Sequence, residues 1–89
     1  MVEEKKSLIE FPLLFPIKVM GVKTDGFVHA LTVVAKNFDP NFDVATIELR
    51  DSSTGKYQGV TLHVWATDQV QLDELYRTLS THPMVKVVL

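Results

Sequence analysis

Apolar and polar residues alternate along four segments of the chain and recur with helical spacing along two others. Alternation is typical of a strand with one buried face, and it runs over residues 15–22, 44–51, 57–66 and 85–89. Apolar residues three and four positions apart predict amphipathic helices over residues 27–38 and 68–81. In chain order the pattern predicts strand, helix, strand, strand, helix, strand.

Each predicted strand has one face that we expect to be buried and one that we expect to stay open. The buried set holds the apolar members of each alternation: Phe15, Ile17, Val19, Ala45, Ile47, Leu49, Val60, Leu62, Val64, Ala66, Val85, Val87 and Leu89. The open set holds the residues between them: Lys18, Met20, Thr46, Glu48, Arg50, Thr61, His63, Trp65, Lys86 and Val88. An open sheet face that carries a tryptophan is unusual for an isolated monomer.

The two predicted helices have apolar stripes and recognisable ends. The stripes consist of Phe27, Leu31, Val34 and Phe38 in the first helix and of Leu72, Leu75, Tyr76 and Leu79 in the second. Thr24 or Asp25 is predicted to cap the first helix by accepting a free backbone N–H. Asp68 and Gln71 fit a capping box at the start of the second. A proline shortly after each stripe predicts where the helix ends.

Two strand–helix–strand units joined by a hairpin predict an α+β fold of the ferredoxin-like type, a βαββαβ plait. The hairpin falls at residues 52–55, where Gly55 can adopt the positive φ of a tight turn. Right-handed crossovers place both helices on the same face of one four-stranded antiparallel sheet. We therefore expect a single domain over residues 11–89, preceded by a flexible N-terminal arm over residues 1–10.

Composition narrows the class of protein. The chain has 89 residues, a formal net charge of −2 and no cysteine, and 46% of its residues are hydrophobic. These values indicate one globular domain without disulfides, thiolate chemistry or a basic nucleic-acid arm. The charged N-terminus lacks the apolar core of a signal peptide, and no apolar run approaches the roughly 20 residues that span a bilayer. We expect a cytoplasmic protein that does not bind membranes.

Several short motifs resemble the YbeD-like family of small uncharacterised bacterial proteins. They are Phe11-Pro12, Phe15-Pro16, Lys18-Val19-Met20-Gly21, Ser52-Ser53, Gly55-Lys56-Tyr57, Val60-Thr61-Leu62, Ala66-Thr67, Leu75-Tyr76 and the closing run from His82 to Leu89. The resemblance covers residues 10–89, with Gly59 standing where the family pattern has a serine. It implies the ferredoxin-like fold of ACT domains, which are small regulatory modules of amino-acid metabolism. It leaves the biochemical function open.

The loop between the first strand and the first helix is one candidate site. ACT domains, which the chain resembles in fold, bind small ligands such as amino acids near this loop. Backbone N–H groups at a helix N-terminus can hold a carboxylate or phosphate, while the carboxylate of Asp25 favours an amino group. The alternative is that Thr24 or Asp25 caps the helix and binds nothing. The candidate ligand-binding residues are Gly21, Thr24, Asp25 and Gly26.

The open sheet face is the other candidate site. Its candidate partner-binding residues are Lys18, Met20, Arg50, His63, Trp65 and Lys86. A homodimer or another protein would cover such a face, and ACT domains generally pair their sheets side by side. The alternative is that long lysine and arginine stems cover Trp65 without a partner. The layout also resembles a stacking platform for single-stranded nucleic acid, but Glu48, the negative net charge and the lack of an aromatic-rich motif argue against that function.

No residue pattern indicates catalysis or a metal site. His29, His63 and His82 lie on different predicted elements at long spacings, and no serine has a nucleophile elbow or a nearby base. We therefore predict no catalytic residue, no cofactor and no metal. The interpretation is a non-enzymatic regulatory or adaptor module that senses a small metabolite, such as an amino acid, at the loop. The alternatives are a protein-interaction domain that docks on an enzyme through the open sheet face, and a binder of single-stranded nucleic acid.

Overall fold

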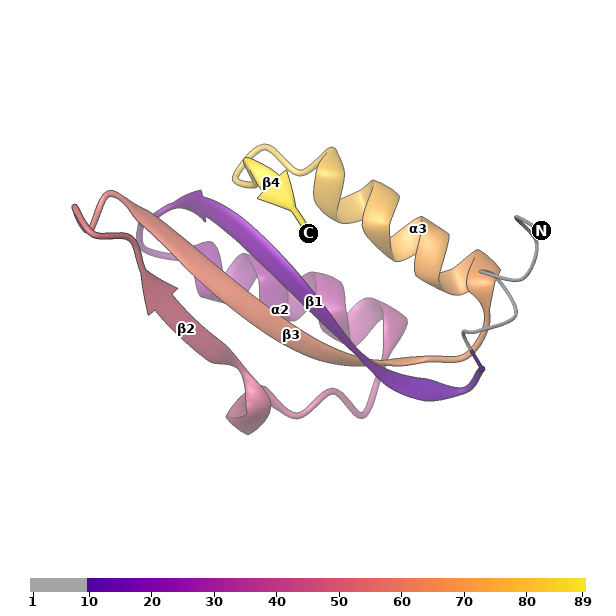
Figure 1. The fold of residues 1–89 in the computed structure, drawn as a ribbon. Helices are drawn as coiled ribbons and strands as arrows, with labels where there is room; N and C mark the ends of the chain where they lie inside the picture. Colours follow the sequence, from indigo (N-terminus) through magenta and orange to yellow (C-terminus); the bar gives the residue numbers. More distant parts are fainter. Residues whose placement is uncertain (1–9) are drawn as a thin grey trace.

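A computed structural model describes residues 10–89, and in it a four-stranded antiparallel sheet carries both helices on one face (Figure 1). The expected arm over residues 1–10 lies outside the described residues except for Glu10. The elements are β1 (Leu13–Val22), α2 (Phe27–Phe38), the short 3-10 helix η1 (Val44–Thr46), β2 (Glu48–Asp51), β3 (Tyr57–Ala66), α3 (Gln69–Ser80) and β4 (Val87–Val88). The strands follow the order β2-β3-β1-β4, which confirms the ferredoxin-like fold.

β1 and β3 form the centre of the sheet. They pair antiparallel along their whole length, from Leu13 opposite Ala66 to Val22 opposite Tyr57. The buried face that alternation predicts for these strands is confirmed, and it holds Ile17, Val19, Val60, Leu62, Val64 and Ala66. β1 begins at Leu13, two residues before the predicted Phe15. This extension places Leu14 on the sheet face that points away from the helices.

The second predicted strand is shorter than its alternating pattern. Residues 44–46 form η1, and β2 spans only Glu48–Asp51. The Asp43 carboxylate accepts the N–H of Ala45 at 2.9 Å, and its carbonyl accepts the N–H of Thr46 at 3.0 Å. A side chain that binds nearby backbone in this way competes with strand pairing. The prediction that Leu49 is buried is also wrong, because β2 is an edge strand and Leu49 is 55% exposed.

The faces predicted for the last strand are reversed in the structure. β4 pairs with β1 so that Val88 lies opposite Val19 and Val87 lies opposite Met20. Val88 therefore packs against the core, while Val87 shares the face of Met20 and is 46% exposed. A shift of one residue moves every side chain of a strand to the other face. Because apolar residues stand at both parities here, alternation alone does not define the register.

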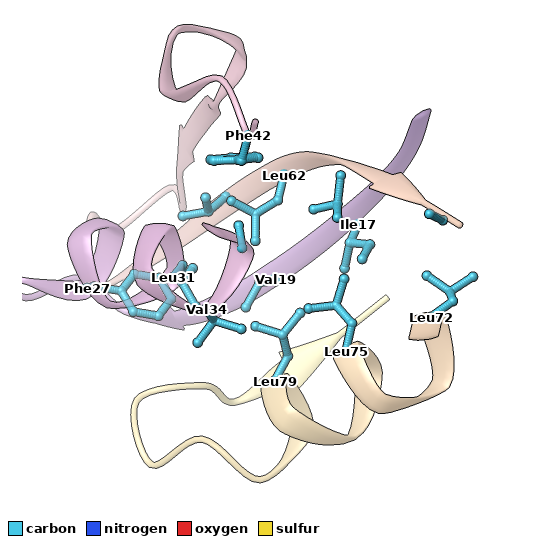
Figure 2. Packing of buried hydrophobic residues seen from close by; sticks show 14 residues of the cluster. Ile17, Val19, Phe27, Leu31, Val34, Phe42, Leu62, Leu72, Leu75 and Leu79 are labelled. Carbon is cyan, nitrogen blue, oxygen red and sulfur yellow. The ribbon is translucent and has the colours of Figure 1, made fainter. Parts of the chain in front are cut away.

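The core lies between the sheet and the helices. Leucines of α3 converge with apolar residues of α2 on the central strands (Figure 2). The helix side chains with no exposed surface are Phe27, Leu31, Ala35, Leu75 and Leu79. Each buried Leu or Phe contributes about 1.5–3 kcal/mol relative to an exposed position, so this face stabilises the domain. Phe38 and Tyr76, which the pattern placed on the buried stripes, are only partly buried at the margin of this core.

The two helices begin in different ways. α2 follows Gly26, whose φ of 86° is left-handed, and no side chain caps it, so the predicted cap at Thr24 or Asp25 is wrong. The carbonyl of Thr24 instead accepts the N–H of Phe27 at 3.2 Å. The predicted cap of α3 is confirmed, because the Asp68 carboxylate accepts the N–H of Gln71 at 2.8 Å.

Candidate functional site

The four residues predicted to bind a ligand do not form one site in the structure. Gly21 lies within β1 and is buried, whereas Thr24, Asp25 and Gly26 are exposed before α2. A Cβ atom at Gly21 would lie 2.3 Å from the carbonyl oxygen of Met84 and 2.7 Å from the ring of Phe27. Close packing therefore accounts for the glycine at position 21.

The same loop is fastened to the hairpin between β2 and β3. The N–H of Lys23 donates to the carbonyl of Lys56 at 2.9 Å, which continues the ladder between β1 and β3. The Lys23 ammonium lies 2.7 Å from the Asp51 carboxylate at the end of β2. One backbone hydrogen bond and one ion pair of Lys23 therefore attach this loop to β2 and to the hairpin that follows it.

The sheet face opposite the helices is the larger candidate surface, here termed the open face. The pairing places on it Leu14, Pro16, Lys18, Met20, Val22, Glu48, Arg50, Tyr57, Gly59, Thr61, His63, Trp65, Val87 and Leu89. All the predicted partner-binding residues except Lys86 lie on this face. Lys86 follows the reversed register of β4 and lies on the helix side, so its predicted placement on the open face is wrong.

A hollow of about 480 Å³, here termed the central hollow, lies in the middle of the open face. Its lining residues are Lys18, Val19, Met20, Glu48, Leu49, Arg50, Gly59, Val60, Thr61 and Leu89. Gly59 stands in the row between Arg50 of β2 and Met20 of β1, and it contributes no side chain. A Cβ atom at Gly59 would come no closer than 3.5 Å to another group, the Arg50 carbonyl oxygen. The backbone therefore has room for a side chain there, and its absence helps to leave the hollow open.

A second hollow extends the first along the open face. It is lined by Leu14, Ala45, Thr46, Ile47, Glu48 and His63, so the two hollows share Glu48. This second hollow lies where η1 replaces the start of the predicted second strand. This second hollow is shallower than the central hollow, and the shortening of β2 leaves it without a neighbouring strand.

Charge is unevenly distributed on the open face. Glu48 is paired, because its Oε2 lies 3.0 Å from Nε2 of His63. Lys18 and Arg50 form no ion pair with any residue within 10–89, although the whole chain carries a net charge of −2. The lining of the central hollow therefore holds two cationic side chains, Lys18 and Arg50, and one carboxylate, that of Glu48.

Trp65 lies at one end of the open face and is 45% exposed. Its row partner Leu14 is 55% exposed. The exposure of Trp65 contradicts the alternative that lysine or arginine stems cover the ring; the cation–π contact within residues 10–89 joins Lys56 to Tyr57 instead, at 5.6 Å. The indole thus remains available as contact surface.

The backbone of Trp65 is held by two side chains that the sequence pattern places near helix ends. Asp39, which is 7% exposed, accepts the N–H of Trp65 through Oδ2 at 3.0 Å. The amide of Gln71 donates to the carbonyls of Phe38 at 3.0 Å and Trp65 at 3.3 Å, and its oxygen accepts the N–H of Thr67 at 3.1 Å. These bonds join the end of α2, the end of β3 and the start of α3.

Two kinds of feature are absent from the described part of the chain. Within residues 10–89, no group of three or more acidic or histidine side chains is arranged to hold a metal ion. Over the same residues, no helix has the length and apolar character needed to cross a bilayer.

Comparison with known proteins places the chain among uncharacterised bacterial relatives. Residues 6–89 match the family profile described as "Protein of unknown function (DUF493)". A UPF0250 protein of Leptothrix cholodnii is 51% identical over 88 residues, covering 99% of this chain and 97% of the relative. A UPF0250 protein of Bordetella pertussis is 53% identical over 85 residues, covering 96% of this chain and 93% of the relative.

A solved structure shares the fold. The solution structure of protein HP0495 from H. pylori superposes with a TM-score of 0.75 and covers 91% of this chain and 85% of its own. Its sequence is only 17% identical, so the likeness concerns architecture alone.

Proposed function

The chain belongs to the DUF493/UPF0250 family of small bacterial proteins, and we propose that it is a non-enzymatic adaptor or regulatory module that docks on a protein partner through the open face. The family assignment confirms the resemblance to YbeD-like proteins. The family description gives no biochemical role, and the proposal supplies one.

The observation that carries the proposal is the concentration of exposed apolar side chains on one sheet face. Leu14, Met20, Trp65, Val87 and Leu89 are each between 40% and 71% exposed, and pairing places them on the same side. Isolated exposed apolar residues are normal, but here they form two groups on one sheet face, Leu14 with Trp65 at one end and Met20 with Val87 and Leu89 at the other. Such grouping is typical of an interaction site. Tryptophan is also enriched among residues that dominate binding energy at interfaces.

The backbone beneath the open face supports such a role because it is rigidly held. β1 and β3 pair from end to end, and Asp39 and Gln71 fix the backbone of Trp65. A binding surface on paired strands loses less conformational entropy on association than one on a mobile loop. This favours recognition by a preformed surface.

Metabolite sensing at the loop before α2 has less geometric support. Gly21 is accounted for by packing, which leaves Thr24, Asp25 and Gly26 as exposed residues on the protein surface. A homodimer formed by two open faces is a rival to a different protein partner. Both alternatives make predictions that separate them from the proposal.

The test is capture of partners from the native organism with matched surface variants. Met20→Ser changes a residue that is 40% exposed on the open face, and Val33→Ser changes one that is 46% exposed on α2. The proposal expects Met20→Ser and Trp65→Ser to lose the captured partner and Val33→Ser to retain it. Retention by all three variants would contradict docking through the open face. Sedimentation of the purified chain separates a homodimer from a hetero-complex.

A further inference from the structure

Building on the proposed function, we infer that the partner presents an extended acidic segment with apolar side chains, whose carboxylate binds between Lys18 and Arg50 in the central hollow. The partner is thus defined by chemistry: Asp or Glu residues interspersed with large apolar residues. An apolar side chain of this segment fills the space over Gly59.

The charge of the central hollow selects an acidic ligand. Two cations, Lys18 and Arg50, stand in the lining against one carboxylate, that of Glu48, which lies in the same row as Lys18 and 3.0 Å from Nε2 of His63. Arg50 offers a planar fork that binds a carboxylate through two hydrogen bonds, and Lys18 adds a second positive charge. Complementary charge of this kind orients a partner and excludes segments of the wrong sign.

The apolar part of the ligand follows from the residues around Gly59. Met20 and Leu89 line the hollow with exposed apolar surface, and the missing side chain at position 59 leaves open the space between Met20 and Arg50. A purely anionic ligand, such as free phosphate, would leave this apolar surface in water. A segment that combines carboxylates with apolar side chains satisfies both kinds of lining.

The two hollows lie end to end along the sheet, and this arrangement favours an extended segment. The central hollow and the second hollow share Glu48 and together reach Leu14, which stands opposite Trp65. From Gly59 to Trp65 a strand rises roughly 20 Å at about 3.3 Å per residue. A segment of about six extended residues therefore spans the two hollows.

The experiment selects binders from a random library of about twelve-residue displayed peptides, a length that exceeds the span of both hollows. The library is panned on the wild-type chain and on the variant Lys18→Glu/Arg50→Glu. The control variant is Lys36→Glu/Arg77→Glu, which makes the same charge change on the helices. The wild type should select sequences rich in Asp and Glu next to large apolar residues. These peptides should bind the Lys18→Glu/Arg50→Glu variant about tenfold or more weakly and the control with little change.

The outcomes separate the two proposals. If the selected peptides are neutral or basic, but lose binding in Gly59→Val and Trp65→Ser, the docking face stands and the acidic ligand is overturned. If no selected peptide depends on Gly59, Trp65, Lys18 or Arg50, both proposals fail. Equal binding to Lys18→Glu/Arg50→Glu and to the control overturns the acidic ligand in either case. Circular dichroism of each variant confirms that the fold is intact before panning.

Discussion

The carboxylate of Asp39 accepts the backbone N–H of Trp65, with 3.0 Å between Oδ2 and the nitrogen. Its other oxygen accepts the N–H of Asn41 at 3.1 Å. β2 pairs with β3 no further than Glu48 opposite Thr61, so this part of β3 has no neighbouring strand on that side. Asp39 therefore takes the place of a strand partner and anchors the tryptophan end of the open face.

Replacing this carboxylate should destabilise the domain. Asp39→Ala leaves the partly buried N–H of Trp65 without its acceptor, which lowers the free energy of unfolding by about 1–3 kcal/mol. Asp39→Asn keeps one acceptor oxygen and should cost less. Urea unfolding measures the effect, with the exposed Asp73→Ala as control at about 0.5 kcal/mol or less. Equal stability of Asp39→Ala and Asp73→Ala would show that the bond contributes nothing.

Two glycines of the sheet should respond oppositely to a methyl group. Gly21→Ala forces a Cβ against the Met84 carbonyl and the Phe27 ring, so it should destabilise by about 1–3 kcal/mol. Gly59→Ala meets only ordinary contacts and removes flexibility from a strand interior, so it should be neutral or stabilise by about 0.5–1 kcal/mol. Thermal unfolding distinguishes them. A harmless Gly21→Ala would remove the packing explanation for this glycine and restore it as a candidate ligand residue.

Stability should fall at alkaline pH through Tyr76. Burial raises the pKa of the Tyr76 phenol above its usual 10.0, and its hydroxyl donates to the carbonyl of Leu89 at 3.2 Å. The folded state therefore holds this proton more tightly than the unfolded state. The contribution of the protonated Tyr76 to the free energy of unfolding is therefore complete below pH 10. It is lost as the pH rises through the raised pKa of the folded state. Tyr76→Phe should flatten this part of the pH profile relative to Tyr57→Phe. Identical profiles for both variants would contradict the assignment.

The two helix starts should differ in their sensitivity to mutation. Asp68→Ala removes the acceptor of the Gln71 N–H and should cost about 1 kcal/mol. Asp25→Ala should change stability by no more than about 0.5 kcal/mol, because no side chain caps α2. Chemical unfolding of both variants provides the comparison. If Asp25→Ala costs as much as Asp68→Ala, the Asp25 carboxylate caps α2 in solution.

The element order and the central strands followed directly from the sequence, because apolar residues at a single parity leave only one face to bury. Val60, Leu62 and Val64 are examples of this unambiguous alternation. The last strand was assigned to the wrong face because Val87 and Val88 are both apolar. Its register is set instead by backbone bonds from Lys86 to Met20 and from Leu89 to Lys18, which no local pattern encodes.

The sequence was enough to predict which residues lie on the open face, but not that the face contains a hollow. Alternation placed Lys18, Met20 and Trp65 on the open face, yet it gave no sign of a hollow. A glycine inside a strand is a signal of close approach or missing side-chain volume, and Gly59 could have been interpreted in that way. The role of Asp39 was beyond reach, because it depends on a contact between residues 26 positions apart.

The sharpest test of docking through the open face is a two-dimensional amide NMR titration of the labelled chain with its captured partner or a selected peptide. Docking there predicts chemical-shift changes centred on Met20, Gly59, Thr61 and Trp65, with the outer surface of α2 around Val33 unchanged. Changes centred on Thr24, Asp25 and Gly26, or on the helices, with the open face unperturbed would contradict it.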